Sequence, residues 1–468
     1  MLNWMTRTLT ATALAVLAAC ADVSMKPYQA PDVPAKHAWS RQQGVPVAPD
    51  EMITRDWWKQ FRDPYLDGLV GRALDANVDL KILAARIRVA SAEIGEARAG
   101  ALPTLDAGAG ASFEKTTGKN FARTFNLGTQ VNWDIDIWGR VAKGAQAQSA
   151  EFSATEADWR AGYLRLAADV STTYFQILQF DEQAAQQEKT LDKNRQILAT
   201  YDAMFQNGLV PHTRVLQQRA EINRLTNDLI ELRRLRALAG NALATLLGTP
   251  AGAFTVPVAT LQQRVQLPVV PEGLPSQLLK RRPDLVAAEY RVLVAYDLVG
   301  QAKLAQLPSI SMTGRGGTAS LALGALLKSF TFGLLPSINF PLFDPGVKAR
   351  IKTSEARTEV AEQQYRRAVF AAFEEVENAL VNLDAHHRQR RELQQQASQL
   401  DIVAAQVTAQ LKEGMVSQLD VFEAERSLLS AQLALLANHQ QILSDTVTLY
   451  KALGGGWPPV DVRNVADN

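Results

Sequence analysis

The spacing of hydrophobic and polar residues changes several times along the chain, and each change predicts a new element. Apolar positions recur every three or four residues across 63–99 and again across 275–305, a period typical of helices packed along one face. A leucine-proline pair follows each stretch, Leu102-Pro103 and Leu307-Pro308. Because proline lacks the amide hydrogen that a helix interior requires, each pair predicts the end of a helix.

Two stretches of alternating apolar and polar residues follow each of these helices. The clearest runs from Phe125 to Ile137, where alternate side chains point to opposite faces of a strand. The sequence therefore predicts four strands, at about 104–116, 123–137, 309–318 and 330–343. A strand with one apolar and one polar face suits a wall between lipid and water. It suits a sandwich strand packed on a core equally well, and the alternation alone does not choose.

Two very long segments, 140–205 and 346–411, contain no proline and are rich in Ala, Gln, Glu, Arg and Leu, all good helix formers. A helix of ~66 residues would reach roughly 100 Å. Each segment ends at a glycine-centred turn, after which a second helical stretch returns. The pattern predicts two long hairpins, at 140–248 and 346–454. A free-standing coiled coil would share it, but the strands between the helices argue against that alternative.

The two sets of elements reflect an internal repeat. Four short landmarks recur in the same order 205 or 206 residues later: Asp79-Leu80 as Asp284-Leu285, Leu102-Pro103 as Leu307-Pro308, Gly208-Leu209-Val210 as Gly414-Met415-Val416, and Leu247-Gly248 as Leu453-Gly454. The nearly constant offset predicts a tandem duplication. We expect a first repeat at 54–248, a proline-rich linker at 249–273, a second repeat at 274–454 and a C-terminal tail at 455–468.

Charge and hydropathy narrow the function classes. The chain carries 49 basic and 48 acidic residues, so nothing indicates a surface for nucleic acid or another polyanion. Beyond the N-terminus no run of 18 or more apolar residues occurs, which argues against spanning helices. A transmembrane β-barrel stays possible, because its alternating strands give a weaker hydropathy signal.

The N-terminus has the pattern of an export signal. A short basic stretch precedes an apolar core, and residues 1–19 therefore predict a signal peptide. Its end, Leu17-Ala18-Ala19-Cys20, resembles the lipobox of bacterial lipoproteins, in which the cysteine carries lipid. Cys20 is the only cysteine, so no internal disulfide can form. Residues 20–53 would be a lipidated tether, and Ala21, in place of the aspartate that retains lipoproteins in the inner membrane, favours the outer membrane.

Several short motifs occur along the chain in a fixed order: Trp57-Trp58, Phe61, Asp63-Pro64, Leu66, Trp133, Asp136, Trp138-Gly139-Arg140, Arg281-Arg282-Pro283-Asp284-Leu285, Ala288-Glu289, and the two glycine turns at 208 and 414. Taken together, they resemble the TolC-type outer-membrane efflux family, in the lipoprotein branch that serves RND-type tripartite systems, and the resemblance covers nearly the whole mature chain. Each motif is weak alone, and their spacing makes the resemblance specific.

The resemblance implies a mainly α fold with β strands, in a homotrimer whose 12-stranded β-barrel continues into a 12-helix α-barrel. The strand count independently supports oligomerisation, because four strands per chain fall short of the roughly eight that a bacterial barrel needs. The implied function is conduction of drugs or other small molecules across the outer membrane of a Gram-negative bacterium. The implied partners are a periplasmic adaptor, an inner-membrane RND-type transporter and outer-membrane lipid.

Two other functions stay open at this point. A type I secretion exit duct shares the fold, and a structural coiled-coil lipoprotein that spans the periplasm would share the long helices. The lipid anchor and the lipoprotein-branch motifs favour efflux of small molecules over protein secretion. A structural spacer would form neither an ion channel nor a detergent-stable trimer.

The resemblance also places candidate site residues at the helix turns. Asp420 and Glu423 correspond to acidic residues that ring the narrowest part of the channel, which would favour cations. Either could instead complement a helix dipole. Arg214, at the position equivalent to Asp420 in the first repeat, is expected to pair with an acidic group on a neighbouring helix and hold the gate closed.

The turns themselves are candidate docking sites for the adaptor. Their residues are Gly208, Leu209, Val210, Gly414, Met415 and Val416. The glycines would allow the tight reversal, and the apolar neighbours would contact the helical hairpin of the adaptor. Packing of these apolar side chains within the turn is the alternative.

Enzymatic function finds little support. The five histidines show no zinc-type spacing, and no phosphate loop or nucleophile elbow occurs. We interpret the histidines as side chains on solvated helix surfaces. No catalysis, metal or cofactor is expected apart from the covalent lipid on Cys20, as N-palmitoyl and S-diacylglycerol groups.

Overall fold

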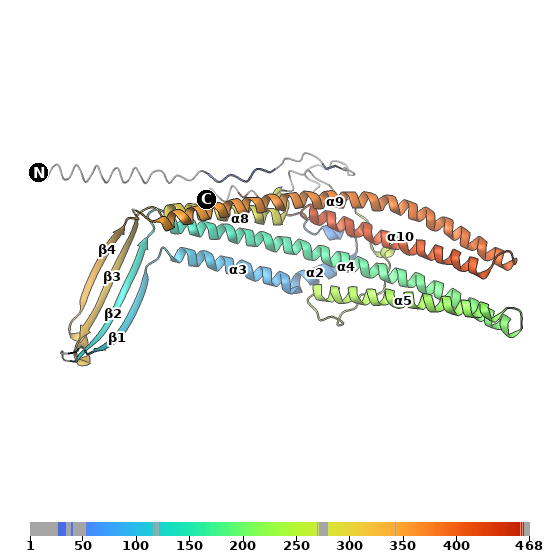
Figure 1. Ribbon diagram of the computed structural model, residues 1–468, viewed down its shortest axis with the longest axis horizontal. Coiled ribbons are helices and arrows are strands. Elements are labelled where there is room, and N and C mark those ends of the chain that lie inside the picture. Colours follow the sequence, from blue (N-terminus) through green and yellow to red (C-terminus); the bar gives the residue numbers. More distant parts are fainter. Residues whose placement is uncertain are drawn as a thin grey trace.

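The computed structural model describes residues 27–33, 39–40, 53–115, 117, 121–268, 270, 279–341, 343–458, 460 and 462, and Cys20 and the predicted signal peptide lie outside them. Within these residues the molecule is long and narrow. A four-stranded sheet stands at one end, and two helical hairpins reach the opposite end (Figure 1). No helix in this part of the chain is both long enough and apolar enough to cross a membrane.

The predicted order of helix, strand pair and long hairpin is confirmed in both repeats. After a short 3-10 helix, η1 (Trp57–Phe61), the first repeat contains α2 (Pro64–Ala76), α3 (Val78–Ala99), β1 (Thr104–Glu114), β2 (Ala122–Ile135), α4 (Arg140–Gln206) and α5 (His212–Leu246). The linker between the repeats contains α6 (Leu261–Arg264). The second repeat contains α8 (Pro283–Leu304), β3 (Ser309–Ser320), η2 (Leu323–Lys328), β4 (Thr331–Asn339), α9 (Pro345–Lys412) and α10 (Gln418–Ala452).

The prediction of one continuous helix across 63–99 is wrong. The chain breaks at Asn77, whose backbone leaves the helical region with ψ 130°. The side-chain oxygen of Asn77 accepts a hydrogen bond from the Leu80 N–H at 3.0 Å. The side-chain nitrogen of Asn77 donates a hydrogen bond to the Leu246 carbonyl at 3.0 Å. Asn77 therefore caps α3 and also ties it to the end of the first hairpin.

The strand ends also differ from the prediction. β1 ends at Glu114 and β4 at Asn339, both earlier than expected, whereas β3 continues to Ser320. Pro341 follows shortly after β4, and proline cannot donate a ladder hydrogen bond. The segment between β3 and β4 contains η2.

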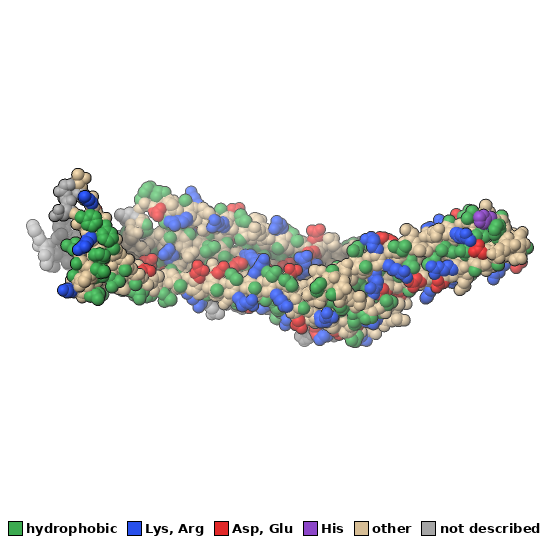
Figure 2. All heavy atoms as spheres, turned by 90° about the horizontal axis from the view of Figure 1, so that it is seen from below, with side chains coloured by type: hydrophobic (Ala, Val, Ile, Leu, Met, Phe, Trp, Pro, Cys, Tyr) green, Lys and Arg blue, Asp and Glu red, His purple; other side chains and the backbone are tan. Residues whose placement is uncertain are grey.

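The sheet is antiparallel in the order β1-β2-β3-β4, so the pairing of β2 with β3 joins the two repeats. One row across the sheet is apolar and consists of Leu105, Val131, Gly314 and Leu334. The neighbouring row, which points to the other face, contains Asp106, Gln130 and Arg315. Figure 2 shows hydrophobic side chains gathered at the sheet and charges of both signs scattered along the helices.

The largest buried side chains gather where η1 meets both hairpins. Trp57 and Phe61 are fully buried, with 0% of each side chain exposed. Trp57 stacks on Tyr450 of α10 with 5.1 Å between ring centroids, and Phe61 contacts Phe175 of α4 at 5.1 Å. The aromatic motif that opens the first repeat thus holds the first and second repeats together.

Two charged residues of the sequence motifs are buried in structural roles. Asp63 caps α2 and also accepts a hydrogen bond from the Tyr174 hydroxyl at 2.7 Å. Arg282 lies 2.6 Å from a Glu375 carboxylate oxygen and donates to the Ala452 carbonyl at 3.3 Å. Because each buried charge has a partner, these motifs lock the helices together at their junctions.

Candidate functional site

The candidate site lies at the end of the molecule opposite the sheet, where α4 turns into α5 and α9 turns into α10 (Figure 1). We call these turns the first tip, residues 207–211, and the second tip, residues 413–417. They are brought to the same end because α4 and α9 have nearly the same length, 67 and 68 residues.

Both tips close through the same backbone hydrogen bonds. In the first tip, the Gly208 N–H donates to the Phe205 carbonyl at 2.9 Å, and the Leu209 N–H donates to the Met204 carbonyl at 2.9 Å. The second tip repeats this pattern from Gly414 and Met415, at 3.1 and 3.0 Å. Such a pair of bonds requires a left-handed residue after the helix.

The tip glycines supply that left-handed residue. Gly208 has φ 71° and Gly414 has φ 74°. No atom lies within 4 Å of the position that a Cβ would take at either glycine. These positions therefore need glycine for its backbone conformation and not for space.

The apolar tip residues separate into exposed and covered side chains. Leu209 is 70% exposed and Met415 is 69% exposed. Val210, in contrast, is only 8% exposed, and Val416 is half-buried. The expectation that all four present apolar surface is wrong for Val210, whose side chain is buried. Of these four residues, Leu209 and Met415 present large apolar surfaces to a partner.

Asp420 belongs to a capping box at the start of α10. Its carboxylate accepts hydrogen bonds from the Ser417 N–H at 2.7 Å and from the Ser417 hydroxyl at 2.6 Å. The Ser417 hydroxyl lowers the pKa of Asp420. The cap is therefore intact at neutral pH and is lost as the pH falls through that lowered pKa. Glu423 is exposed and makes no ion pair with any residue that the structure describes.

Arg214 is half-buried near the start of α5. Within the described ranges of this single chain, it forms no ion pair, so the predicted pairing with an acidic residue is not present inside one chain. Arg214 lies close enough to Tyr201 to act on it electrostatically. Burial raises the pKa of Tyr201, and the positive charge of Arg214 opposes that change.

A contact between the two hairpins escaped the sequence analysis. The Tyr201 hydroxyl on α4 donates to the side-chain oxygen of Gln418 on α10. Further along the same helices, the Gln186 amide donates to Gln432 at 2.6 Å. Tyr201 and Gln418 are 7% and 3% exposed. Polar groups buried in pairs hold a specific alignment of two helices, so these bonds set how the two tips sit beside each other.

The histidines do not all lie on solvated surfaces. His439 is 8% exposed, and burial lowers its pKa to about 4. The Nδ1 atom of His386 lies 2.5 Å from the buried Asp445 carboxylate. His386 and His439 lie where α9 and α10 pack together, so we interpret both as structural residues of that helix interface. Among the described residues, no three His, Cys, Asp or Glu side chains gather in a metal-binding arrangement.

Comparison with known proteins identifies relatives over almost the whole chain. The family described as "Outer membrane efflux protein" matches residues 69–249 and 274–455, one match for each repeat. The "Cation efflux system protein CusC" of Escherichia coli O6:H1 is 30% identical over 436 residues, which cover 92% of this chain and 95% of the relative. The "Probable outer membrane lipoprotein SilC" of Salmonella typhimurium is 28% identical over 451 residues, covering 94% of this chain and 97% of the relative.

A solved structure shares the fold. The open state of the MtrE outer membrane channel of Neisseria gonorrhoeae superimposes with a TM-score of 0.82 at 29% identity, covering 92% of this chain and 98% of that one. That protein is an outer membrane channel. The likeness therefore extends over the sheet and both hairpins, not only one repeat.

Tyr201→Phe tests whether the buried hydrogen bond aligns the tips. We expect a local loss of about 1–3 kcal/mol, because the Gln418 oxygen is left buried without a donor. Hydrogen–deuterium exchange should become faster in peptides covering 196–206 and 413–423. A matched double variant, Tyr201→Phe with Gln418→Met, removes both polar partners and should exchange nearly as slowly as wild type. Unchanged exchange in Tyr201→Phe alone would contradict the role.

Proposed function

The chain belongs to the outer membrane efflux protein family and is an outer-membrane channel component of a tripartite efflux pump, and we propose that it acts as a homotrimer. The observation that carries this proposal is the open sheet. In the order β1-β2-β3-β4, the outer edges of β1 and β4 have no partner strand among the described residues. In lipid, no water can satisfy those backbone groups.

Other copies of the chain would satisfy these edges if β4 of one copy pairs with β1 of the next. Two copies would supply eight strands, a narrow barrel filled by side chains, whereas three supply twelve and leave room for a lumen. The row containing Asp106, Gln130 and Arg315 would then face water in the bore. The apolar row on the other face would face lipid.

The helices continue this wall toward the tips. α3, α4, α8 and α9 all have one end at the sheet (Figure 1), so closing the sheet would bring the helices of three copies into one tube. Drugs or other small molecules would pass along this bore from the periplasm to the exterior. The pump and the adaptor would deliver the substrate to this bore.

We assign the charged constriction of this bore mainly to Glu423. Asp420 already uses one carboxylate oxygen to bind Ser417, whereas the exposed carboxylate of Glu423 is available to the bore. Arg214 would complete the gate by pairing with an acidic group of a neighbouring copy. Three carboxylates at one level would favour cations over anions.

Planar lipid bilayers test the channel and its constriction together. Purified wild-type protein should be trimeric by light scattering and should conduct ions with a preference for cations. Glu423→Gln should lower the cation-to-anion permeability ratio roughly twofold, because it removes one negative charge per copy. The ratio would be read from the reversal potential in a KCl gradient.

Two variants complete this experiment. Glu413→Gln removes an exposed charge from the second tip on the other side of the turn and should leave the ratio unchanged. Arg214→Ala should raise the conductance if the arginine holds the gate closed, and an unchanged conductance would rule that role out. Wild-type protein that is monomeric and does not conduct would refute the homotrimeric channel.

We further propose that the exposed Leu209 and Met415 side chains dock the periplasmic adaptor, which links the channel to an inner-membrane RND-type transporter. Leu209 and Met415, at 70% and 69% exposure, place one large apolar side chain at each tip, where a partner can cover it. Their neighbour Val210 is already buried in the turn. A helical hairpin of the adaptor would supply the apolar surface that covers the exposed pair.

Charged substitutions at the tips test this docking. Leu209→Asp with Met415→Asp should reduce drug resistance to the level of a deletion strain, measured as the minimum inhibitory concentration, while trimers still form. Val258→Asp is the matched control, because Val258 is 76% exposed but lies in the linker far from the tips in sequence. Normal resistance in the tip variant would argue against adaptor docking at these residues.

Cys20 is proposed as the lipid anchor, carrying N-palmitoyl and S-diacylglycerol groups. The relative SilC is described as a probable outer membrane lipoprotein, and the sequence ahead of Cys20 has the lipobox pattern. Several acyl chains on one residue give stable anchoring, which one chain does not. The anchor would hold the subunit at the membrane that the strands cross.

Mass spectrometry of the mature chain tests the anchor. The N-terminal peptide should begin at Cys20 and carry three acyl chains, and Cys20→Ala should lack them. Because the sheet still spans the membrane in this variant, Cys20→Ala trimers should remain in the outer-membrane fraction. A wild-type N-terminal peptide without lipid would contradict the assignment.

A further inference from the structure

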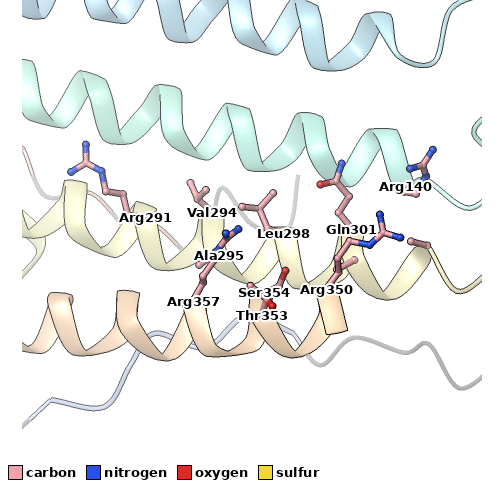
Figure 3. Close-up of a pocket in the computed structure, with 12 residues that line it drawn as sticks. Arg140, Arg291, Val294, Ala295, Leu298, Gln301, Arg350, Thr353, Ser354 and Arg357 are labelled. Carbon is pink, nitrogen blue, oxygen red and sulfur yellow. The ribbon is translucent and has the colours of Figure 1, made fainter. Parts of the chain in front are cut away.

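A pocket lined by four arginines lies near the sheet end of the helices, between α4, α8 and α9 (Figure 3). Its volume is ≈ 600 Å³, within the range of sites for drug-sized ligands. The arginines are Arg140 of α4, Arg291 of α8, and Arg350 and Arg357 of α9. No carboxylate belongs to the lining that the structure describes.

The four arginines are compensated to different extents. Arg291 pairs with Asp158 and lies 3.6 Å from a Glu151 oxygen. Arg350 is 3.8 Å from an Asp344 oxygen. In the part of the chain that the structure describes, Arg140 and Arg357 form no ion pair. The pocket therefore keeps an excess of positive charge, centred on Arg140 and Arg357.

The stretch of α8 between these charges is apolar, whereas Gln301, Thr353 and Ser354 add polar groups to the lining. Val294, Ala295 and Leu298 of α8 line it between Arg291 and the far end. At that end lies Gln301, which shares the lining with Arg140 and Arg350 (Figure 3). Gln301 is seated against α4 at Gly144, where an added Cβ would come within 2.4 Å of its amide nitrogen. An apolar floor with charged donors at its rim suits a ligand that has an apolar body and an anionic group.

The N-terminal tether shows which way the pocket faces. Arg366 of α9 donates to the Asp32 carbonyl at 3.1 Å, and the Ser40 N–H donates to Glu377 at 2.9 Å. Arg366 follows Arg357 by nine residues, which is about two and a half helical turns. The tether and the pocket therefore occupy opposite sides of α9. The proposed lipid on Cys20 would place the tether outside the proposed tube, and the pocket, on the opposite side of α9, would then face the bore.

We propose that this arginine pocket is a binding subsite in the bore for amphiphilic organic anions, molecules with an aromatic or aliphatic body and a carboxylate, sulfonate or phosphate group. Guanidinium groups bind such oxyanions through paired hydrogen bonds. The position of the subsite in the bore rests on the proposed trimeric channel, whereas binding itself does not. Three copies would place three subsites at one level, between the barrel and the acidic tips.

A subsite in a conduction path has to bind weakly enough to release its ligand. The exposed charges on Arg350 and Arg357 meet this requirement, because interactions with exposed charges are weakened by salt. Organic anions that have passed the tips would bind transiently at this pocket before they reach the barrel. The wall of this channel would then contribute to substrate preference, in addition to the pump.

Isothermal titration calorimetry on full-length trimers in non-ionic detergent tests the subsite with naphthalene-2-sulfonate as the probe. Wild type should bind the sulfonate and bind the neutral 2-naphthol much more weakly. Arg357→Gln should weaken sulfonate binding about threefold and Arg350→Gln with Arg357→Gln about tenfold, as expected for lost charge-assisted contacts. Lys348→Gln with Lys352→Gln removes the same charge from the opposite side of α9 and should bind like wild type.

Three outcomes would overturn the subsite. These are no binding to wild type, equal binding of sulfonate and 2-naphthol, and equal weakening by the arginine and lysine variants. Arg357 touches no ion partner among the described residues, so its single variant keeps the test valid if the double variant does not assemble. Bilayer conductance of the same trimers separates the two proposals. Absent conductance refutes the channel, while the calorimetry still decides the subsite.

Discussion

The outer edges of β1 and β4, which pair with no strand among the described residues, govern the rest of this structure. A sheet edge in water can bind solvent, but in a bilayer it has to bind another strand. The row Leu105, Val131, Gly314 and Leu334 commits one face of the sheet to lipid, so the edges cannot withdraw into water. The need to hydrogen-bond these strand edges therefore favours assembly of several copies, and the ring of copies encloses the bore.

Because of the duplication, one chain contributes two wall segments that have the same order of elements. Each repeat uses a helix, a strand pair and a glycine-turned hairpin, and the repeats meet at the β2–β3 pairing and at the core around Trp57. Near the tips, the hydrogen bond between Tyr201 of α4 and Gln418 of α10 also joins the two repeats. These contacts join the two repeats near the sheet, at the core and near the tips, and we expect relative motion to occur between copies.

The elements governed by local pattern were predictable, and those governed by packing were not. Alternation at Phe125 to Ile137 predicted β2 to within a few residues, and the proline-free segments predicted α4 and α9. Asn77 was a recognisable cap inside an apolar pattern, and its break was missed. Tyr201 and Gln418 meet only after both hairpins pack. The four pocket arginines are likewise scattered over three helices, and no spacing rule connects them.

The unequal starts of α5 and α10 have a consequence for symmetry. Ser417 caps α10 through a reciprocal hydrogen-bond pair with Asp420, whereas Pro211 precedes α5 and makes no side-chain cap. A proposed ring of three chains therefore presents six tips of two alternating kinds, one followed by a helix with a side-chain cap and one followed by a helix without it. A partner built with sixfold symmetry would meet a threefold surface. The six subunits of such a partner must then either adopt two different contacts with the tips or make their strongest contacts at every second tip.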